Sequence, residues 1–595
     1  MSEKIVSPGV FTRENDLSFL PAGIGAIGAA VVGPTVKGPA GIPTVVSSYS
    51  EYVDKFGQTF SSGSDYYQYL TSYTAERYLQ YGAALTVVRV TGQNPTNATA
   101  SVGTSSAAIT TDGTTFKLHS LSHGIRLNSA DTAGTATIGQ NNALSNASGN
   151  PDSLRWEIAS KNDETGTFTL LIRRGNDTSN NKSILETWNG VSLDPNSTNY
   201  ISKVVGDSYD TVQGTSADPY IQNTGEFPNK SAYVRVEILK KTIDYMDENG
   251  VIRVSDASAS LPAVGSGSLG GAFGGGYDGD SLASGAASLF NDDITSANCQ
   301  GYDWNDTANT NGGANAVQAL NLLKNQDFYD INMIVVPGAN QKDHSAIVNK
   351  AISVCETRGD CLAVVDPVGH GQTIAVAYGE ADDYNSSYGC FYWPWVQISD
   401  NQLGKNVWVP PSVVMPGVMA YNDQPGIGAE WYAPAGLNRG GITCIKAERN
   451  LTHTDRDSLY ENRINPIATF PGVGVCAWGQ KTLQKRASAL DRINVRRLLI
   501  NLKKFIASTS KYLVFEQNTS STRNRFLSTV IPYMEEVQAN QGLYAFKVVM
   551  DGSNNTADVI DRNIMKGDIF LQPAKAAEFI VIDFNIMPTG ATFDD

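Results

Sequence analysis

Apolar and polar positions follow two different periods along the chain, and the change of period separates its segments. Residues 331–338 (INMIVVPG) and 361–367 (CLAVVDP) are short, nearly continuous apolar runs, as in strands that are buried on both faces of a parallel sheet. Between them, residues 343–357 carry apolar side chains at helical spacing, namely Ile347, Val348, Ala351, Ile352 and Cys355. This order predicts a β-α-β unit and an α/β segment.

A second group of segments has the two-residue period of antiparallel strands. Residues 154–160 (LRWEIAS) and 167–175 (TFTLLIRRG) alternate and are separated by the polar turn KNDETG, which predicts a hairpin. Before them, residues 92–150 are dense in Thr, Ser, Ala, Asn and Gly, a profile typical of an inserted surface domain with short strands. Residues 261–281 are so rich in Gly and Ser that we expect a flexible linker or mobile loop.

After residue 441 the pattern turns helical, and residues 488–507 give the clearest case. Apolar side chains recur there at i, i+3, i+4 and i+7, at Val495, Leu498, Leu499, Leu502, Phe505 and Ile506. The other face carries Arg492, Arg496, Arg497, Lys503 and Lys504. With Lys481, Lys485, Arg486 and Lys511, nine cations face a single acid, Asp491, within residues 481–512. Such a cluster is either a solvated face or a docking surface for a partner of negative potential.

The stretch GIGAIG at residues 23–28 matches the G-x-G-x-x-G fingerprint of dinucleotide-binding loops. That fingerprint needs a strand before the first glycine and a long helix after the last. Pro21 removes a ladder donor upstream, and the Gly-Pro pairs at 33–34 and 38–39 leave no room for the helix. We therefore expect no nucleotide cofactor, and we interpret residues 26–33 as a buried strand whose small side chains allow close backbone approach.

Composition and charge limit which partners the protein can bind and in which compartment it is made. The chain has 595 residues, enough for several domains, and a formal charge of −15, which argues against broad binding to a phosphate backbone. Its six cysteines form no C-x-x-C pair and are interpreted as buried thiols of a protein made in a reducing cytoplasm. The start MSEKIVSPGV lacks a signal-peptide pattern, and the apolar run 19–34 is too rich in Gly and Pro for a membrane span. We expect no direct contact with nucleic acid or membrane.

Candidate catalytic residues are sparse. Asp366, His370 and Cys361 could form a nucleophilic site of an α/β enzyme, but DPVGHG is equally typical of a turn after a strand, with Asp366 as a cap. His119 and His123 lack companion ligands at the spacing of a structural zinc site. We expect no enzyme, no metal and no cofactor, and we keep the enzyme with Asp366, His370 and Cys361 as the less favoured alternative.

Both ends of the chain have strand patterns. VFTREND lies near the start, and in AAEFIVIDFNIMPTGATF the residues Ile580, Ile582, Phe584 and Ile586 share one face until Pro588 ends the ladder. Terminal strands this apolar need a partner, and an open sheet edge of a neighbouring copy supplies one by β-augmentation. Because such a contact is heterologous, it generates rings or helical tubes.

Several stretches resemble one protein family. SPGVFTREND, ETWNGVSLDPNSTNYI (186–201), NRINPIATFPGVGVCAWGQKTL (462–483), SALDRINVRRLLINLKKFI (488–506) and PAKAAEFIVIDFNIMPTGATF (573–593) are similar to the contractile tail sheath proteins of myovirus-type bacteriophages. The likeness is close at both ends and in the last third, and it is slight in residues 92–150. It implies stacked six-membered rings around a tail tube, metastable when extended, that contract to drive the tube through the host envelope for genome ejection. The sheath of a bacterial injection device, of pyocin or secretion type, is the alternative.

The resemblance also implies a fold. We expect a multidomain α+β and α/β protein of tail-sheath fold, with a β-α-β middle domain, an inserted β-rich outer domain, an inner C-terminal α/β domain and extended arms. The expected boundaries are an N-terminal arm at 1–22, a discontinuous middle domain at 23–91 and 206–320, an outer domain at 92–205, an α/β domain at 321–440, an inner sheath domain at 441–576 and a C-terminal arm at 577–595.

Site residues are carried over from the family in two groups. The inter-subunit arms map onto Val10, Phe11, Thr12, Arg13 and Glu14, and onto Phe579, Ile580, Val581, Ile582, Asp583, Phe584, Asn585 and Ile586. The candidate contacts with the tube are Arg492, Arg496, Arg497, Lys503 and Lys504. The implied partners are further copies of the chain in sixfold rings, the tail tube protein, and the baseplate and tail terminator proteins at the two ends. The implied location is the virion tail, assembled in the host bacterial cytoplasm.

Overall fold

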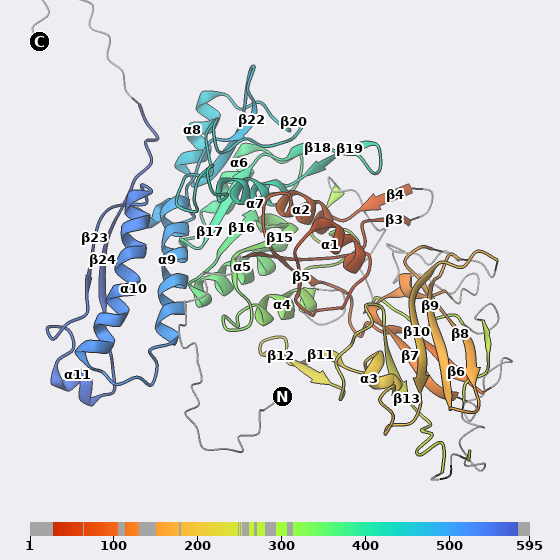
Figure 1. Cartoon of the computed structure of the whole chain (residues 1–595). Helices are drawn as coiled ribbons and strands as arrows, with labels where there is room; N and C mark the ends of the chain where they lie inside the picture. The colour runs from red at the N-terminus through yellow and green to blue at the C-terminus, as the bar shows by residue number, and fades with distance from the viewer. Residues whose placement is uncertain are drawn as a thin grey trace, which may run out of the picture.

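The architecture is that of a computed structural model, in which three packed regions lie side by side (Figure 1). A β-rich region and a helical C-terminal region flank a central α/β region. The structure describes residues 28–62, 65–104, 114–129, 150–177, 180–247, 249, 251–252, 261–266, 271–279, 293–305 and 313–580. The predicted N-terminal arm and residues 581–586 of the predicted C-terminal arm lie outside this description.

The central region is built on one eight-stranded sheet of order β2-β5-β1-β15-β16-β17-β21-β22. The inner strands run parallel, and β2 and β22 pair antiparallel at the two edges. The strands are β1 (Gly28–Gly33), β2 (Thr44–Val46), β5 (Leu85–Arg89), β15 (Ile331–Asn340), β16 (Leu362–Asp366), β17 (Gly389–Trp393), β21 (Ile464–Phe470) and β22 (Gly474–Ala477).

Helices cover both faces of this sheet, and each face has its own apolar core. In β1, Ala30 and Val32 belong to one core, and Ala29 and Val31 belong to the other. The first face is covered by α4 (Gly313–Leu322), α5 (Gln341–Arg358), α6 (Ile374–Ala381) and α8 (His453–Glu461). The second face is covered by α1 (Tyr49–Phe56), α2 (Leu70–Leu79) and α7 (Pro411–Asn422). Burial on both faces explains the nearly continuous apolar runs of the strands.

The predicted β-α-β unit is confirmed as β15, α5 and β16. The helix starts where the side chain of Asn340 accepts a hydrogen bond from the Asp343 N–H at 2.9 Å. It ends at Gly359, whose left-handed φ of 70° suits a residue without Cβ. The two strands are parallel neighbours in the sheet.

The buried strand predicted at residues 26–33 is confirmed for its described part, β1. All six of its residues are buried. A Cβ placed on Gly33 would lie 2.3 Å from Oγ1 of Thr71, and one on Gly28 would lie 2.6 Å from the Ala84 carbonyl oxygen. The glycines therefore serve close packing of β1 against α2 and the segment that leads into β5.

The β-rich region contains two facing sheets around one core. The three-stranded sheet holds β6 (Asn97–Gly103), β7 (Thr114–His123) and β13 (Val234–Ile238). The four-stranded sheet holds β8 (Leu154–Asn162), β9 (Thr167–Arg174), β10 (Ile184–Ser192) and β14 (Gly265–Ser266). The predicted hairpin is confirmed as β8 and β9. A 3-10 turn (Ile125–Leu127), α3 (Ile201–Val204) and the hairpin of β11 (Tyr209–Gly214) and β12 (Pro219–Thr224) complete the region.

The predicted end of the outer domain at residue 205 is wrong. β13 pairs with β7, and the core of the region includes Leu261 and Phe273, both at most 2% exposed. Residues 261–281, expected as a linker, are instead integrated wherever they are described, because β14 pairs with β8 and Thr99 pairs with Gly274. Ladder hydrogen bonds and one buried aromatic ring offset the entropy of ordering these glycines.

The central sheet joins three segments that we expected in separate domains. Strands from 28–89, 331–393 and 464–477 are hydrogen-bonded neighbours, so the boundaries at 320/321 and 440/441 cut through one layer. Parallel pairing brings together strands that are far apart in sequence, and local composition carries no sign of it.

The short strands of the central region are β3 (Thr59–Ser62), β4 (Asp65–Gln68), β18 (Val396–Asp400), β19 (Lys405–Val409) and β20 (Lys446–Ala447).

The C-terminal region is a small unit with its own core. It consists of α9 (Ile493–Lys511), α10 (Ser520–Ala539), β23 (Leu543–Val549), α11 (Ala557–Asp561) and β24 (Asp568–Pro573). The helix predicted at 488–507 is confirmed as α9, preceded by a 3-10 turn at Ala489–Asp491. Leu498 and Leu502 of α9 pack on α10, whereas Ile493 and Ile500 join the core of the central sheet. The helix therefore bridges two cores. None of the described helices is long and apolar enough to cross a membrane.

Candidate assembly interface

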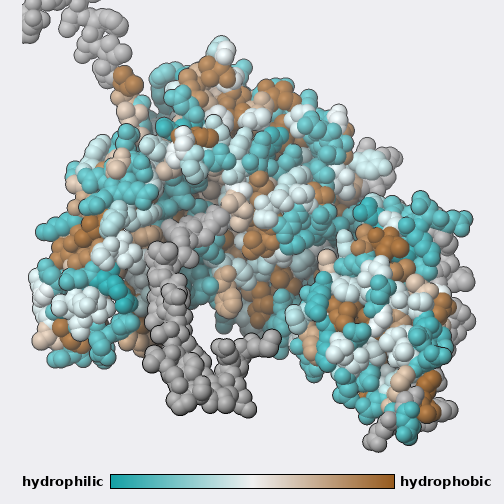
Figure 2. All heavy atoms as spheres, in the orientation of Figure 1, coloured by the Kyte–Doolittle hydropathy of each residue, from teal (hydrophilic) through white to brown (hydrophobic). Residues whose placement is uncertain are grey.

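β23 and β24 form an antiparallel ladder that has no third strand among the described residues. Phe546 pairs with Leu571 and Val548 with Ile569, and these side chains pack against the core that α10 shares. On the outside, Tyr544 and Phe570 are about 60% exposed, at 59% and 61%. Figure 2 shows hydrophobic side chains gathered over this ladder.

Such a ladder is suited to accept further strands. An isolated two-stranded sheet is marginally stable, and its outer edges present unpaired N–H and C=O groups. Exposed aromatic rings beside an open edge give an added strand apolar surface to cover. The physical chemistry of this face is that of a β-augmentation site.

The chain leaves the same unit through residues 574–580, here called the strap (Figure 1). At its start the Ala574 N–H donates to the Gly542 carbonyl oxygen at 3.0 Å. Near its end Glu578 forms an ion pair with Arg492, with Nε to Oε1 at 2.7 Å and Nη2 to Oε2 at 3.0 Å. Directly after it, Phe579 and Ile580 are each 79% exposed. The two predicted arm residues that the structure describes therefore present apolar side chains to solvent.

The predicted tube-contact residues do not share one exposed face. Arg496 and Arg497 are each 4% exposed. The Arg496 guanidinium lies 4.1 Å from the centre of the Tyr388 ring, and Arg497 forms an ion pair with the half-buried Asp423. The prediction of a free cationic face is wrong for these two residues, because α9 packs on the central region as well as on α10. A single helical period cannot reveal a second contact face.

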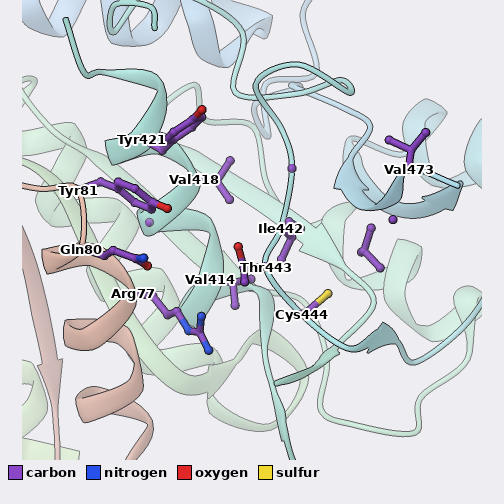
Figure 3. Close-up of a pocket in the computed structure, with 14 residues that line it drawn as sticks. Arg77, Gln80, Tyr81, Val414, Val418, Tyr421, Ile442, Thr443, Cys444 and Val473 are labelled. Carbon is purple, nitrogen blue, oxygen red and sulfur yellow. The ribbon is translucent and has the colours of Figure 1, made fainter. Parts of the chain in front are cut away.

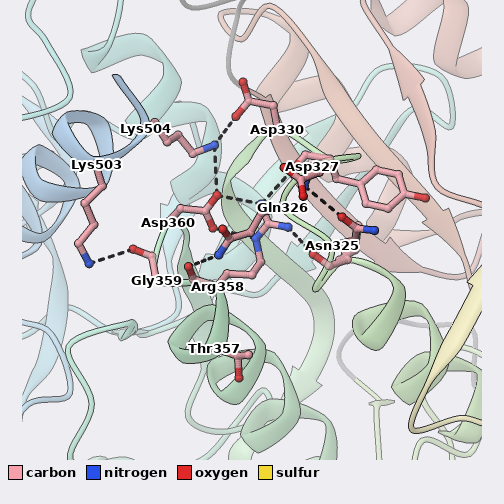
Figure 4. A network of polar contacts seen from close by, with 12 residues as sticks. Asn325, Gln326, Asp327, Asp330, Thr357, Arg358, Gly359, Asp360, Lys503 and Lys504 are labelled. Atoms are coloured by element: carbon pink, nitrogen blue, oxygen red, sulfur yellow. Dashed lines mark hydrogen bonds and ion pairs between the residues drawn. The ribbon is translucent and has the colours of Figure 1, made fainter. Parts of the chain in front are cut away.

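The remaining three predicted tube contacts also have partners within the chain. Figure 4 shows Lys504 between Asp330 and Asp360, with which it forms ion pairs. Lys503 is exposed, and its Nζ lies 3.4 Å from the Gly359 carbonyl oxygen and from the Tyr388 hydroxyl. Arg492 is bound by Glu578 and Asp491. This seam between α9 and the central region neutralises much of the charge that the sequence concentrates at residues 481–512.

The residues of the catalytic alternative are not brought together. Cys361 precedes β16 and Asp366 ends it, so the strand rise of about 3.3 Å per residue separates them by ~16 Å. The Asp366 carboxylate accepts from the Ser412 N–H at 3.0 Å and from the Ser412 hydroxyl at 2.5 Å. Burial raises the pKa of Asp366 to about 7, although the bonds from Ser412 oppose the shift. Asp366 therefore anchors the start of α7, while His370 lies against the rings of Trp395 and Trp408.

A pocket of about 480 Å³ lies between α2, α7, the 441–444 segment and the tip before β22 (Figure 3). Its walls are formed largely by valines, tyrosines and glycines, with the single cation Arg77 at one side. The lining residues include no carboxylate and no histidine, so they offer no acid-base pair. Within the described part of the chain, no three His, Cys, Asp or Glu side chains cluster to hold a metal ion. His119 pairs with Glu237 at 2.7 Å, and His123 accepts from the Ala40 N–H at 3.2 Å.

Comparisons with known proteins converge on one family. Residues 312–483 match the phage tail sheath protein central domain, and residues 486–587 match the phage tail sheath C-terminal domain. The tail sheath protein of Vibrio phage KVP40 is 34% identical over 319 residues, which cover 49% of this chain and 47% of that protein. That of Enterobacteria phage T4 is 32% identical over 300 residues, which cover 47% and 45%. The chain thus spans about half the length of the curated relatives it matches.

Among solved structures, the sheath tail protein Lin1278 from Listeria innocua aligns with 90% of this chain and 90% of its own length, at 11% identity and a TM-score of 0.49. The likeness to phage tail sheath proteins comes from the sequence matches. The first matched domain ends at Leu483 beside the central sheet, and the second starts at Arg486 just before α9, so the two domains meet at the seam described above. Residues 312–483 and 486–587 are thus similar to the two domains of phage tail sheath proteins.

Proposed function

We propose that this protein is the structural subunit of a bacteriophage contractile tail sheath. Copies assemble as stacked hexameric rings around the tail tube in a metastable extended state, and contraction drives the tube through the host envelope. The two sheath domains and the curated phage relatives support this assignment and favour a phage tail over a bacterial injection device. Assembly takes place in the host cytoplasm, and the product is part of the virion.

The observation that carries the proposal is that one unit of the chain contains both an open two-stranded ladder and the start of an apolar tail. β23 and β24 offer two edges, and the chain beyond Glu578 continues with the alternating pattern of a strand. Residues 579–586 of one copy, and residues 10–14 of another, add to these edges in a neighbouring copy. Main-chain hydrogen bonds supply affinity, and the apolar side chains cover Tyr544 and Phe570.

Energy for movement is stored at assembly and needs no nucleotide. Extended copies are kinetically trapped, and contraction moves them into a second packing that buries more surface. Strands laced between copies keep neighbours tethered while the bodies slide. Lys503, exposed on α9, remains our candidate for a charged contact with the tube, whereas Arg496 and Arg497 stabilise the subunit itself. Baseplate and terminator proteins contact the two ends of the tube of rings.

The arms can be tested by truncation. We expect the full chain to form rings or tubes in negative-stain micrographs and in sedimentation velocity. A chain without residues 579–595 should remain unassembled with an unchanged circular dichroism spectrum. The matched control removes only residues 588–595, beyond the predicted strand, and should assemble normally. Polymerisation of the longer truncation at wild-type concentration would refute the arm mechanism.

A further inference from the structure

The strap is fixed at a point where the two sheath domains meet. Glu578 accepts from Gln480, in the segment after β22, at 3.0 Å, and from Arg492, which directly precedes α9. Gln480 belongs to the matched central domain and Arg492 to the matched C-terminal domain. A single carboxylate therefore binds both domains at their junction.

The site around this carboxylate is built to hold an anion. The side chains of Glu578 and Arg492 are only 18% and 25% exposed. Tyr460 of α8 lies beneath the two cations, with Lys481 at 4.2 Å and Arg492 at 5.9 Å from its ring centre. Burial raises the pKa of Glu578, but hydrogen bonds from Arg492, Gln480 and Tyr460 outweigh it and lower the pKa overall. The group is ionised at neutral pH, and its bidentate pair with Arg492 is of the strong, directional kind.

The contacts of Glu578 with Gln480 and Arg492, here called the clamp, decide at which residue the C-terminal arm leaves its own subunit. Between the Ala574 N–H bond and Glu578, the described strap belongs to no strand of a sheet. Without the carboxylate, the last attachment of the arm among the described residues is the Ala574 N–H bond, which lengthens the tether between the subunit and the acceptor edge. A shorter tether raises the effective concentration of the arm at an edge within its reach. It also selects one direction of departure.

We propose that Glu578 is a positioning residue for sheath assembly, which fixes the root of the C-terminal arm at the junction of the central and C-terminal domains. The inference rests on the proposed function, because it concerns the arm that joins neighbouring copies. Since the clamp joins both domains, the root of the arm stays at their junction, and every copy offers its arm from the same place.

The test measures assembly and folding separately in the full chain. We expect Glu578→Gln to raise the critical concentration for assembly, measured by light scattering, about tenfold. The unfolding midpoint measured below that concentration should change little. Glu535→Gln, on the exposed side of α10, is the matched control for loss of one negative charge and should assemble as wild type. A wild-type critical concentration for Glu578→Gln overturns the proposal.

A double-mutant cycle with Arg492→Gln shows whether Glu578 acts through this pair. We expect the double variant to assemble as poorly as either single variant, because each change removes the same contact. Additive defects, or a lowered unfolding midpoint with a normal critical concentration, overturn the positioning role. If the chain without residues 579–595 assembles, the proposed arm mechanism itself fails. If that truncation fails to assemble while Glu578→Gln is normal, only the clamp is refuted.

Discussion

Arg89, at the end of β5, forms a fully buried ion pair with Asp278, which lies 189 residues further along the chain in the β-rich region. Both side chains have no exposed surface. The guanidinium also donates to the Gly38 carbonyl at 2.9 Å and the His123 carbonyl at 2.7 Å, and the carboxylate accepts from the Ile125 N–H at 2.9 Å. The pair is thus the polar centre of the contact between the central and β-rich regions.

Removing one partner of this pair should lower the free energy of unfolding strongly. Asp278→Asn leaves the Arg89 guanidinium buried without a counter-charge, and we expect the free energy of unfolding to fall by about 3–5 kcal/mol. Urea denaturation measures the loss, and limited proteolysis should cut the β-rich region first. Asp163→Asn removes an exposed pair with Lys161 and should cost under about 1 kcal/mol. Equal losses in the two variants would show that the buried pair has no special role.

The buried Arg497 ties α9 to the central region through its ion pair with the half-buried Asp423. Arg497→Ala leaves Asp423 without its cation, close to the half-buried Glu430, and removes a buried side chain, so we expect a loss of about 3 kcal/mol in unfolding free energy. The control is Lys511→Ala, also on α9, where Lys511 forms an exposed ion pair with Asp327. It should change the unfolding free energy by under about 1 kcal/mol. Thermal unfolding of unassembled protein compares the two. If both variants behave alike, α9 is not held by its buried charge.

Sequence reasoning succeeded where the structural signal is local. The β-α-β unit, the β8–β9 hairpin and α9 could each be predicted, because one period over a dozen residues encodes which side is buried. Sequence reasoning failed where a strand pairs with a partner far away along the chain. Nothing near β13 or Phe273 indicates that β7 and the β-rich core lie more than a hundred residues earlier.

The candidate site shows the same division. The apolar alternation after Glu578 predicts an arm, which stays a prediction because only Phe579 and Ile580 of it are described, both exposed. The sequence places the cations of α9 on one outer face, because a helical wheel sorts residues by a single apolar stripe. α9 has two such stripes, through Leu498 and Ile500, and the buried Arg496 and Arg497 belong to the seam against the central region.

The close packing of β1 gives a prediction about glycine. Gly33→Ala places a Cβ against Thr71, so we expect a loss of about 1–3 kcal/mol in unfolding free energy from overpacking. Gly379→Ala, at an exposed position of α6, meets nothing within 4 Å and should gain up to about 1 kcal/mol from helix propensity. Chemical denaturation of both variants gives opposite signs if β1 is packed as described. A neutral Gly33→Ala would mean that α2 shifts at no cost.

The buried carboxyl group of Asp366 should make the stability of the protein depend on pH. Its pKa is about 7 in the folded protein and about 3.9 in the unfolded chain. Because the folded state binds the proton more tightly, the free energy of unfolding falls as pH rises from about 4 to 7 and then levels off. Asp366→Asn resembles the protonated form and still pairs with Ser412, so it lacks this fall. From pH 5 to pH 8 we expect the variant to gain about 2–3 kcal/mol relative to wild type. Asp561→Asn, on exposed α11, should run parallel to wild type in urea denaturation over the same range. If the curve of Asp366→Asn also stays parallel, the carboxylate is ionised in the folded protein with no penalty, and its anchoring of α7 is that of an ordinary helix cap.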